Sequence, residues 1–93
     1  MKNHYEVWAL GYKGDSITDT DIQLWGDMQS RDLAMLSAIS LFTYEDVIEQ
    51  ITKQGDLDRV RDVDQFNIVA EKVNPFGETI DVVISSWVEK GRV

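Results

Sequence analysis

The sequence predicts an α+β domain in which a four-stranded antiparallel sheet packs on two helices, in the order ββααββ. Segments rich in aromatic and β-branched residues stand at both ends of the chain, whereas the middle carries apolar residues at helical spacing. Separate runs of strands and helices are typical of this class. Because 93 residues suffice for one modest core, we treat 1–93 as a single acidic α+β domain.

The first two strands are predicted to form a hairpin. "HYEVWALGY" (4–12) has the aromatic and β-branched composition of a strand. "KGDSITD" (13–19) is turn-like, since Gly14 and Asp15 favour a break in regular structure. "DIQLWGDM" (21–28) alternates apolar and polar residues and is predicted to return as the second strand.

Two helices are predicted in the middle of the chain. Ser30 is a candidate N-cap for the segment 31–42, "RDLAMLSAISLF". Apolar residues occupy most of its sides, so we expect a buried central helix that shows water only a narrow face of serines. The second helix, 43–55, begins with Thr43 and Asp46 at capping-box spacing, although Asp replaces the usual Glu.

The last third is predicted to contain two more strands. "FNIVAEKV" (66–73) is followed by "NPFGE" (74–78), which holds the only proline beside a glycine and is typical of a turn. "TIDVVISSWVE" (79–89) alternates as a long strand. We expect its Ile80, Val82 and Ile84 to face the helices. The same side of the sheet is expected to carry Ile22 and Leu24 of the second strand and Ile68 of the third.

The segment 55–64, "GDLDRVRDVD", has three possible interpretations. As a calcium loop starting at Asp56 it fails, because positions five, six and twelve would be Val60, Arg61 and Asn67. As a helical turn it places opposite charges three residues apart, which favours a solvated amphipathic turn. As a mimic of DNA charge it is too weak alone, so mimicry would need a larger acidic surface. The rim of such a surface would be Asp56, Asp58, Asp62 and Asp64.

The aromatic residues of the strands are the main candidates for a functional surface. Strand alternation predicts that Trp8, Tyr12, Trp25 and Trp87 lie together on the sheet face opposite the helices. One explanation is that a helix or loop folds over this face, or that one strand register differs from the simple alternation. The other is a protein interface, for a partner or a second copy, because Trp and Tyr concentrate in interface hot spots.

Composition excludes several functions. The net charge of −8 argues against direct contact with nucleic acid or an anionic membrane. The single histidine, His4, lies near the terminus, and the chain contains no metal-ligand, phosphate-loop or nucleophile motif. We therefore expect no catalytic residues, no cofactor and no metal. Without cysteine, signal peptide or a membrane-length apolar run, the chain is expected to be cytoplasmic.

The first 40 residues carry a family resemblance. "HYEVWALGY", a polar turn, "LWGDM" and the Ala- and Ser-rich "SRDLAMLSAIS" resemble small uncharacterised accessory proteins of phages and conjugative elements of Gram-positive bacteria. The resemblance implies a cytoplasmic accessory role and brings no catalytic residues. The acidic segment 55–64 departs from it.

These observations predict a small acidic binding protein, not an enzyme, that acts through protein–protein contacts. Its partner would be another protein or a second copy of the chain, which would make a homodimer through the aromatic sheet face. The alternative is an acidic DNA-mimic inhibitor of a nucleic-acid-binding protein, and a third hypothesis is a small enzyme that uses carboxylates.

Overall fold

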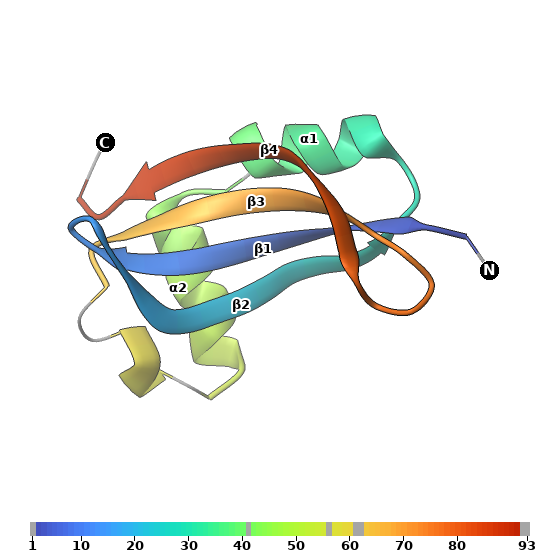
Figure 1. Cartoon of the computed structure of the whole chain (residues 1–93). Helices are drawn as coiled ribbons and strands as arrows, with labels where there is room; N and C mark the ends of the chain where they lie inside the picture. Colours follow the sequence, from blue (N-terminus) through green and yellow to red (C-terminus); the bar gives the residue numbers. More distant parts are fainter. Residues whose placement is uncertain (1, 41, 56, 61–62, 92–93) are drawn as a thin grey trace.

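A computed structural model describes residues 2–40, 42–55, 57–60 and 63–91 and confirms the predicted α+β class (Figure 1). The elements follow one another in the predicted order, with one short 3₁₀ helix added between α2 and β3. They are β1 (His4–Lys13), β2 (Ser16–Met28), α1 (Arg31–Ser40), α2 (Tyr44–Lys53), η1 (Leu57–Val60), β3 (Gln65–Val73) and β4 (Thr79–Glu89).

The four strands form one antiparallel sheet in the order β2-β1-β3-β4, so β2 and β4 are its edges. Both helices lie on the same side of the sheet. Figure 1 views the other side, with α2 behind β1 and β2 and with α1 beside β4. We call the side that packs on the helices the covered face, and the opposite side the outer face.

The hydrophobic core lies between the covered face and the helices. Val7 of β1, Phe66 and Ile68 of β3 and Val47 of α2 have no exposed surface. The Tyr44 ring at the start of α2 lies 5.3 Å from the Phe66 ring, centroid to centroid. Large side chains of β1, β3 and α2 therefore fill the centre of the domain.

The β1–β2 hairpin is tighter than the sequence predicts. β2 begins at Ser16, so the turn consists of Gly14 and Asp15 and the predicted loop 13–19 is wrong. Gly14 has φ of 56°, a left-handed conformation that glycine adopts without strain. The register between β1 and β2 shifts beside Gly11, where the Thr18 hydroxyl donates to the Gly11 carbonyl at 2.9 Å. Because of this irregular pairing, the start of β2 lacks the alternation by which a strand is predicted from sequence.

β4 is bent in its first half. The register with β3 shifts between Ala70 and Glu71, so Ile84 pairs with Ala70 but Val82 pairs with Glu71. The extra residue changes the side that the strand presents. Ile84 packs against the core as predicted, whereas Ile80 and Val82 are exposed, which corrects their expected position. In Figure 1 this part of β4 curves across the outer face.

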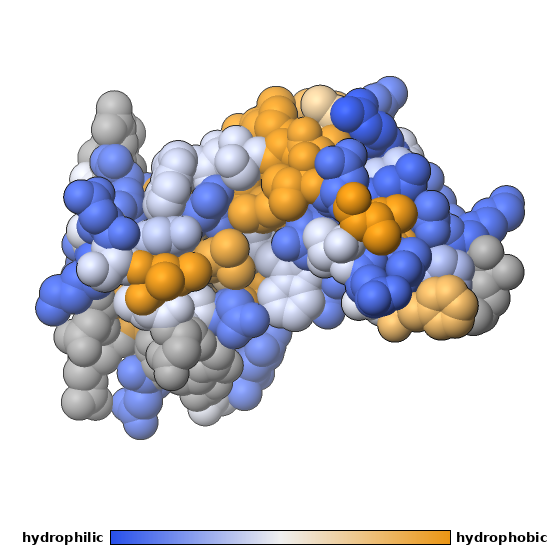
Figure 2. Space-filling model, viewed as in Figure 1, coloured by the Kyte–Doolittle hydropathy of each residue, from blue (hydrophilic) through white to orange (hydrophobic). Residues whose placement is uncertain are grey.

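α1 is not the buried central helix that the sequence predicts. Its buried residues are the small side chains Ala34, Ser37 and Ala38, and Ser37 donates its hydroxyl to the Leu33 carbonyl at 2.8 Å. Its large apolar side chains Leu33, Leu36 and Ile39 are about half exposed. Small residues let the helix approach the sheet closely, and this turns the large ones outward. Figure 2 shows the resulting apolar atoms gathered over α1 and the middle of β4.

Neither α1 nor α2, the two α-helices in the described ranges, is long and apolar enough to cross a membrane.

α2 begins with the predicted capping box. The Thr43 hydroxyl accepts from the Asp46 N–H at 3.1 Å, and the Asp46 carboxylate accepts from the Thr43 N–H at 2.8 Å. We expect Thr43→Ala to lower the free energy of unfolding by about 1 kcal/mol, measured by urea denaturation. Thr52→Ala is the matched control, since Thr52 lies exposed inside the same helix and its loss leaves the cap intact. Equal effects of the two changes would contradict a role for the cap.

Candidate functional site

Tyr12 and Trp87 form an aromatic pair on the outer face. Tyr12 of β1 pairs in register with Gln65 of β3, and Trp87 of β4 pairs with Asn67. The two rings meet across β3 at 4.8 Å between centroids, edge to face. This geometry is favourable for aromatic rings. Trp87 remains 50% exposed, so the pair presents an ordered aromatic surface to solvent.

A polar atom lies within the same part of the outer face. Asn67 pairs with Leu10 on one side and with Trp87 on the other. Its Oδ1 is buried and has no hydrogen-bond partner among the residues that the structure describes. A buried acceptor without a donor costs free energy. The Asn67 oxygen is therefore an acceptor that a donor from another molecule could satisfy.

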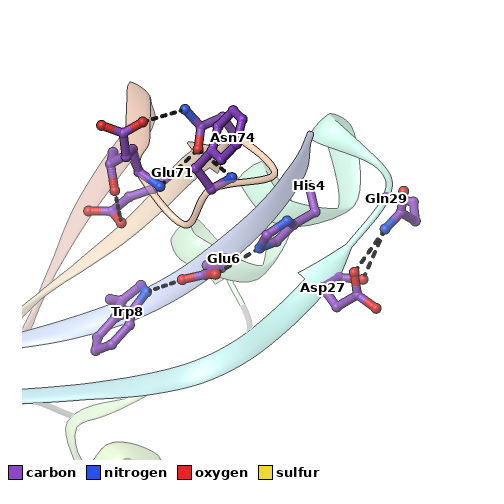
Figure 3. A network of polar contacts seen from close by, with 10 residues as sticks. His4, Glu6, Trp8, Asp27, Gln29, Glu71 and Asn74 are labelled. Carbon is purple, nitrogen blue, oxygen red and sulfur yellow. Dashed lines mark hydrogen bonds and ion pairs between the residues drawn. The ribbon is translucent and has the colours of Figure 1, made fainter. Parts of the chain in front are cut away.

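Trp8 lies on the outer face as predicted, but its side chain is hydrogen-bonded to another residue of β1. The Glu6 carboxylate accepts from the Trp8 indole N–H at 2.9 Å and contacts His4 Nε2 at 2.8 Å (Figure 3). His4, Glu6 and Trp8 are alternate residues of β1, so their side chains follow one another on one side of the strand. Trp8 is only partly exposed and its indole N–H has an internal partner, so it offers less to a ligand than Trp87.

Trp25 does not belong to this surface, which corrects the predicted grouping. It pairs in register with Val7, a covered-face residue, and the register shifts on both sides of that pair. Its ring meets the ring of Phe42, just before α2, at 5.8 Å between centroids. A bulge places Leu24 and Trp25 toward the same side. The three remaining predicted interface residues, Trp8, Tyr12 and Trp87, do lie on the outer face.

Open depressions surround Trp87 at the end of the sheet where β4 stops. One, of about 450 Å³, lies between the aromatic pair and the β1–β2 turn and is lined by Tyr12, Gly14, Asp15, Gln65, Trp87 and Glu89. Another, of about 390 Å³, lies between Trp87 and the start of α2. Trp87 borders both, so it stands as a ridge between two hollows.

Acidic side chains surround these hollows. Asp15 and Glu89 line the first one, and Asp64 lines a neighbouring hollow of about 400 Å³. Asp64 also holds this end together, because its carboxylate accepts from the Gly14 N–H at 3.2 Å. Its backbone N–H donates to the Tyr12 carbonyl at 3.0 Å, and its carbonyl accepts from the Lys90 N–H at the same distance. The site therefore combines an aromatic centre with negative charge at its border.

Only part of the predicted acidic rim lies at the border of this site. Asp64 lies there, whereas Asp58 is exposed on η1, which contacts α2 and β2 instead. Asp56 and Asp62 lie outside the described residues. Sequence reasoning missed Asp15 and Glu89, which come from a turn and a strand end that only the fold brings together.

Tyr44 lies at the edge of the second hollow with its hydroxyl turned inward. The hydroxyl donates to the Val63 carbonyl at 2.9 Å. Burial raises the pKa of the Tyr44 phenol above its usual value, and the nearby carboxylates of Asp64 and Glu45 raise it further. Tyr44 therefore supports the site as a neutral hydrogen-bond donor.

In the described part of the chain, no three His, Cys, Asp or Glu side chains are grouped closely enough to hold a metal ion. The arrangement is suited to contact with another molecule through aromatic and charged side chains.

Comparisons of the chain with protein-family models, with curated proteins and with solved structures found no match. The resemblance of the first 40 residues to phage and conjugative-element proteins stays a prediction.

Proposed function

We propose that this chain is a small non-enzymatic binding protein that acts in the cytoplasm through protein–protein contacts. The observation that carries the proposal is Trp87, half exposed, ordered by Tyr12 and raised between two hollows. Tryptophan and tyrosine are enriched among the hot-spot residues of protein interfaces. The contact surface is the end of the outer face around Tyr12 and Trp87.

The chemistry of the site favours a basic segment of the partner. Asp15 and Glu89 line the hollow beside the aromatic pair, and Asp64 lines the neighbouring hollow together with Lys90. The whole chain carries a net charge of −8. An arginine or lysine side chain can lie over an aromatic ring while its charge meets nearby carboxylates. Long-range attraction between the acidic domain and a basic partner also speeds association.

The alternative, mimicry of DNA, receives less support from the shape of the domain. Its longest dimension is 38 Å, a length over which duplex DNA carries about 22 charges. The whole chain has 17 acidic residues. Those that the structure describes lie on both sides of the sheet, with Glu6 and Glu71 on the outer face and Glu45 and Glu49 on α2. Protein binding through the Tyr12–Trp87 end of the sheet does not require the acidic residues to gather on one side of the domain.

Trp87→Ala tests the proposal. Immobilised wild-type chain is used to capture a partner from the cytoplasm of its native host, and the affinity of the purified partner is then measured by calorimetry. We expect Trp87→Ala to weaken binding at least about 30-fold, as for a typical hot spot. We also expect affinity to fall as salt is added, because the carboxylate border contributes.

Phe76→Ala is the matched control, since Phe76 is 85% exposed in the β3–β4 turn, away from the hollows. Circular dichroism verifies that both variants fold. A partner held equally well by wild type and Trp87→Ala would contradict the proposed surface. A partner displaced by duplex DNA would favour the mimicry alternative.

A further inference from the structure

The two longest stretches without a charged residue lie side by side in the fold. They are 33–44 and 82–88, in a chain where 28% of residues are charged. The first covers most of α1 and the second most of β4, and these two elements pack together. They form one apolar surface at the β4 edge, visible in Figure 2 over α1 and the middle of β4. We call it the α1–β4 surface; its exposed apolar side chains on α1 are Leu33, Leu36 and Ile39.

The β4 edge is open to strand pairing in its second half. From Ile84 to Glu89 the register with β3 is unshifted, and this segment has no proline, no lysine and no charge before Glu89. The Lys90 N–H donates inward to the Asp64 carbonyl. Because an antiparallel ladder alternates, the N–H groups of Ser85 and Trp87 point outward from the sheet. Natural proteins usually protect such an edge with charges or bulges.

The opposite edge of the sheet is protected in just this way. β2 carries three aspartates and its register with β1 shifts at three places. Bulges and charges both oppose pairing with another strand. The two edges of the same sheet therefore differ, and β4 is the one suited to pairing.

We propose that the α1–β4 surface binds a second copy of this chain, with β4 pairing antiparallel to β4 of the copy. Such pairing about a two-fold axis uses the same residues from both chains, so one surface is complementary to itself. It joins two four-stranded sheets into one continuous sheet. The α1 helices meet across the axis and bury Leu33, Leu36 and Ile39.

Charge selects a second copy over another partner. Two chains of net charge −8 repel each other through most of their surfaces. The two chains can approach closely where both lack charge. The α1–β4 surface is such a region, because it is built from the two longest uncharged stretches of the sequence. A basic partner would instead be attracted to the acidic hollows around Trp87. In the dimer both outer faces lie on the same side of the joined sheet, so the hollow between Trp87 and the β1–β2 turn stays open in each chain.

The test is the mass of the chain in solution, measured by sedimentation over a wide concentration range. We expect wild type to reach twice the monomer mass of 10.7 kDa. Leu33→Glu combined with Ile39→Glu should weaken dimerisation at least about 100-fold. Ser85→Pro should weaken it separately, because proline removes an outward N–H while the inward ladder remains.

The matched control is Ile17→Glu combined with Phe76→Glu, which makes the same change of charge at two exposed apolar positions outside the surface. This control should dimerise like wild type. A wild-type chain that stays monomeric at every concentration overturns the proposal. So does a dimer that survives both the α1 change and Ser85→Pro.

Discussion

Replacing Phe66 with alanine is expected to lower the free energy of unfolding by about 3–5 kcal/mol. Phe66, the second residue of β3, is fully buried and packs against Tyr44 at the start of α2. Its loss opens a cavity between the sheet and that helix, which the surrounding β1 and β4 strands cannot close. A domain of this size has a total stability of about 5–14 kcal/mol, so this single change removes a large fraction of it.

Urea denaturation followed by circular dichroism measures this effect, with wild type and variant fitted with a common slope. Phe76→Ala is the control, because it makes the same substitution at an exposed ring and should change stability by less than about 0.5 kcal/mol. A small loss for Phe66→Ala, equal to that of Phe76→Ala, would show that the core does not depend on this ring.

The covered face could be predicted from the sequence because its signals are local. Alternation placed Ile22, Ile68 and Ile84 toward the helices, and the structure confirms all three. The α2 cap followed from Thr43 and Asp46 alone. A helix start or a regular strand depends on residues only a few positions apart, and the sequence shows those directly.

Bulges are the main reason for the errors. A bulge shifts every later residue of a strand to the other side, yet it leaves no mark in an alternating sequence. One shift moved Trp25 to the side of Phe42, and another turned Val82 outward beside Glu71. The aromatic surface predicted with four members is therefore a pair, Tyr12 and Trp87, with Trp8 further along the face.

α1 shows a different limit of periodicity. Its apolar residues lie on most sides, so the pattern does not indicate which side meets the sheet. The small residues Ala34 and Ala38 face the sheet because they let the helix approach it closely. Leu33 and Ile39 therefore lie on the exposed side of the helix. The proposed dimer interface thus arises from residues that hydrophobicity alone assigns to the core.

The stability of the domain at alkaline pH should depend on Tyr44. Because its folded pKa is raised above the usual value of 10.0, the folded state holds the phenol proton more tightly than the unfolded state does. Below the unfolded pKa both states keep the proton and the full stability is present. As pH rises above that value the unfolded state ionises first, so stability falls until the pH passes the folded pKa.

Tyr44→Phe removes this alkaline loss but has a cost at neutral pH. It leaves the Val63 carbonyl without its phenol donor, which should lower the free energy of unfolding by about 1–3 kcal/mol. Denaturant midpoints measured from neutral pH to above pH 10 should therefore fall more steeply for wild type than for Tyr44→Phe. Parallel curves for the two chains would contradict a raised Tyr44 pKa.

Asp64→Asn separates the two causes of the shift. Asparagine keeps an oxygen that can accept from the Gly14 N–H, so the end of the sheet stays tied while the negative charge is lost. Burial still raises the Tyr44 pKa, but the contribution of Asp64 is gone. The tyrosinate absorbance assigned to Tyr44, by difference from Tyr44→Phe, should then appear at lower pH than in wild type. An unchanged titration would mean that burial and Glu45 alone set this pKa, and that Asp64 acts on the hollows beside Trp87 only through its hydrogen bonds.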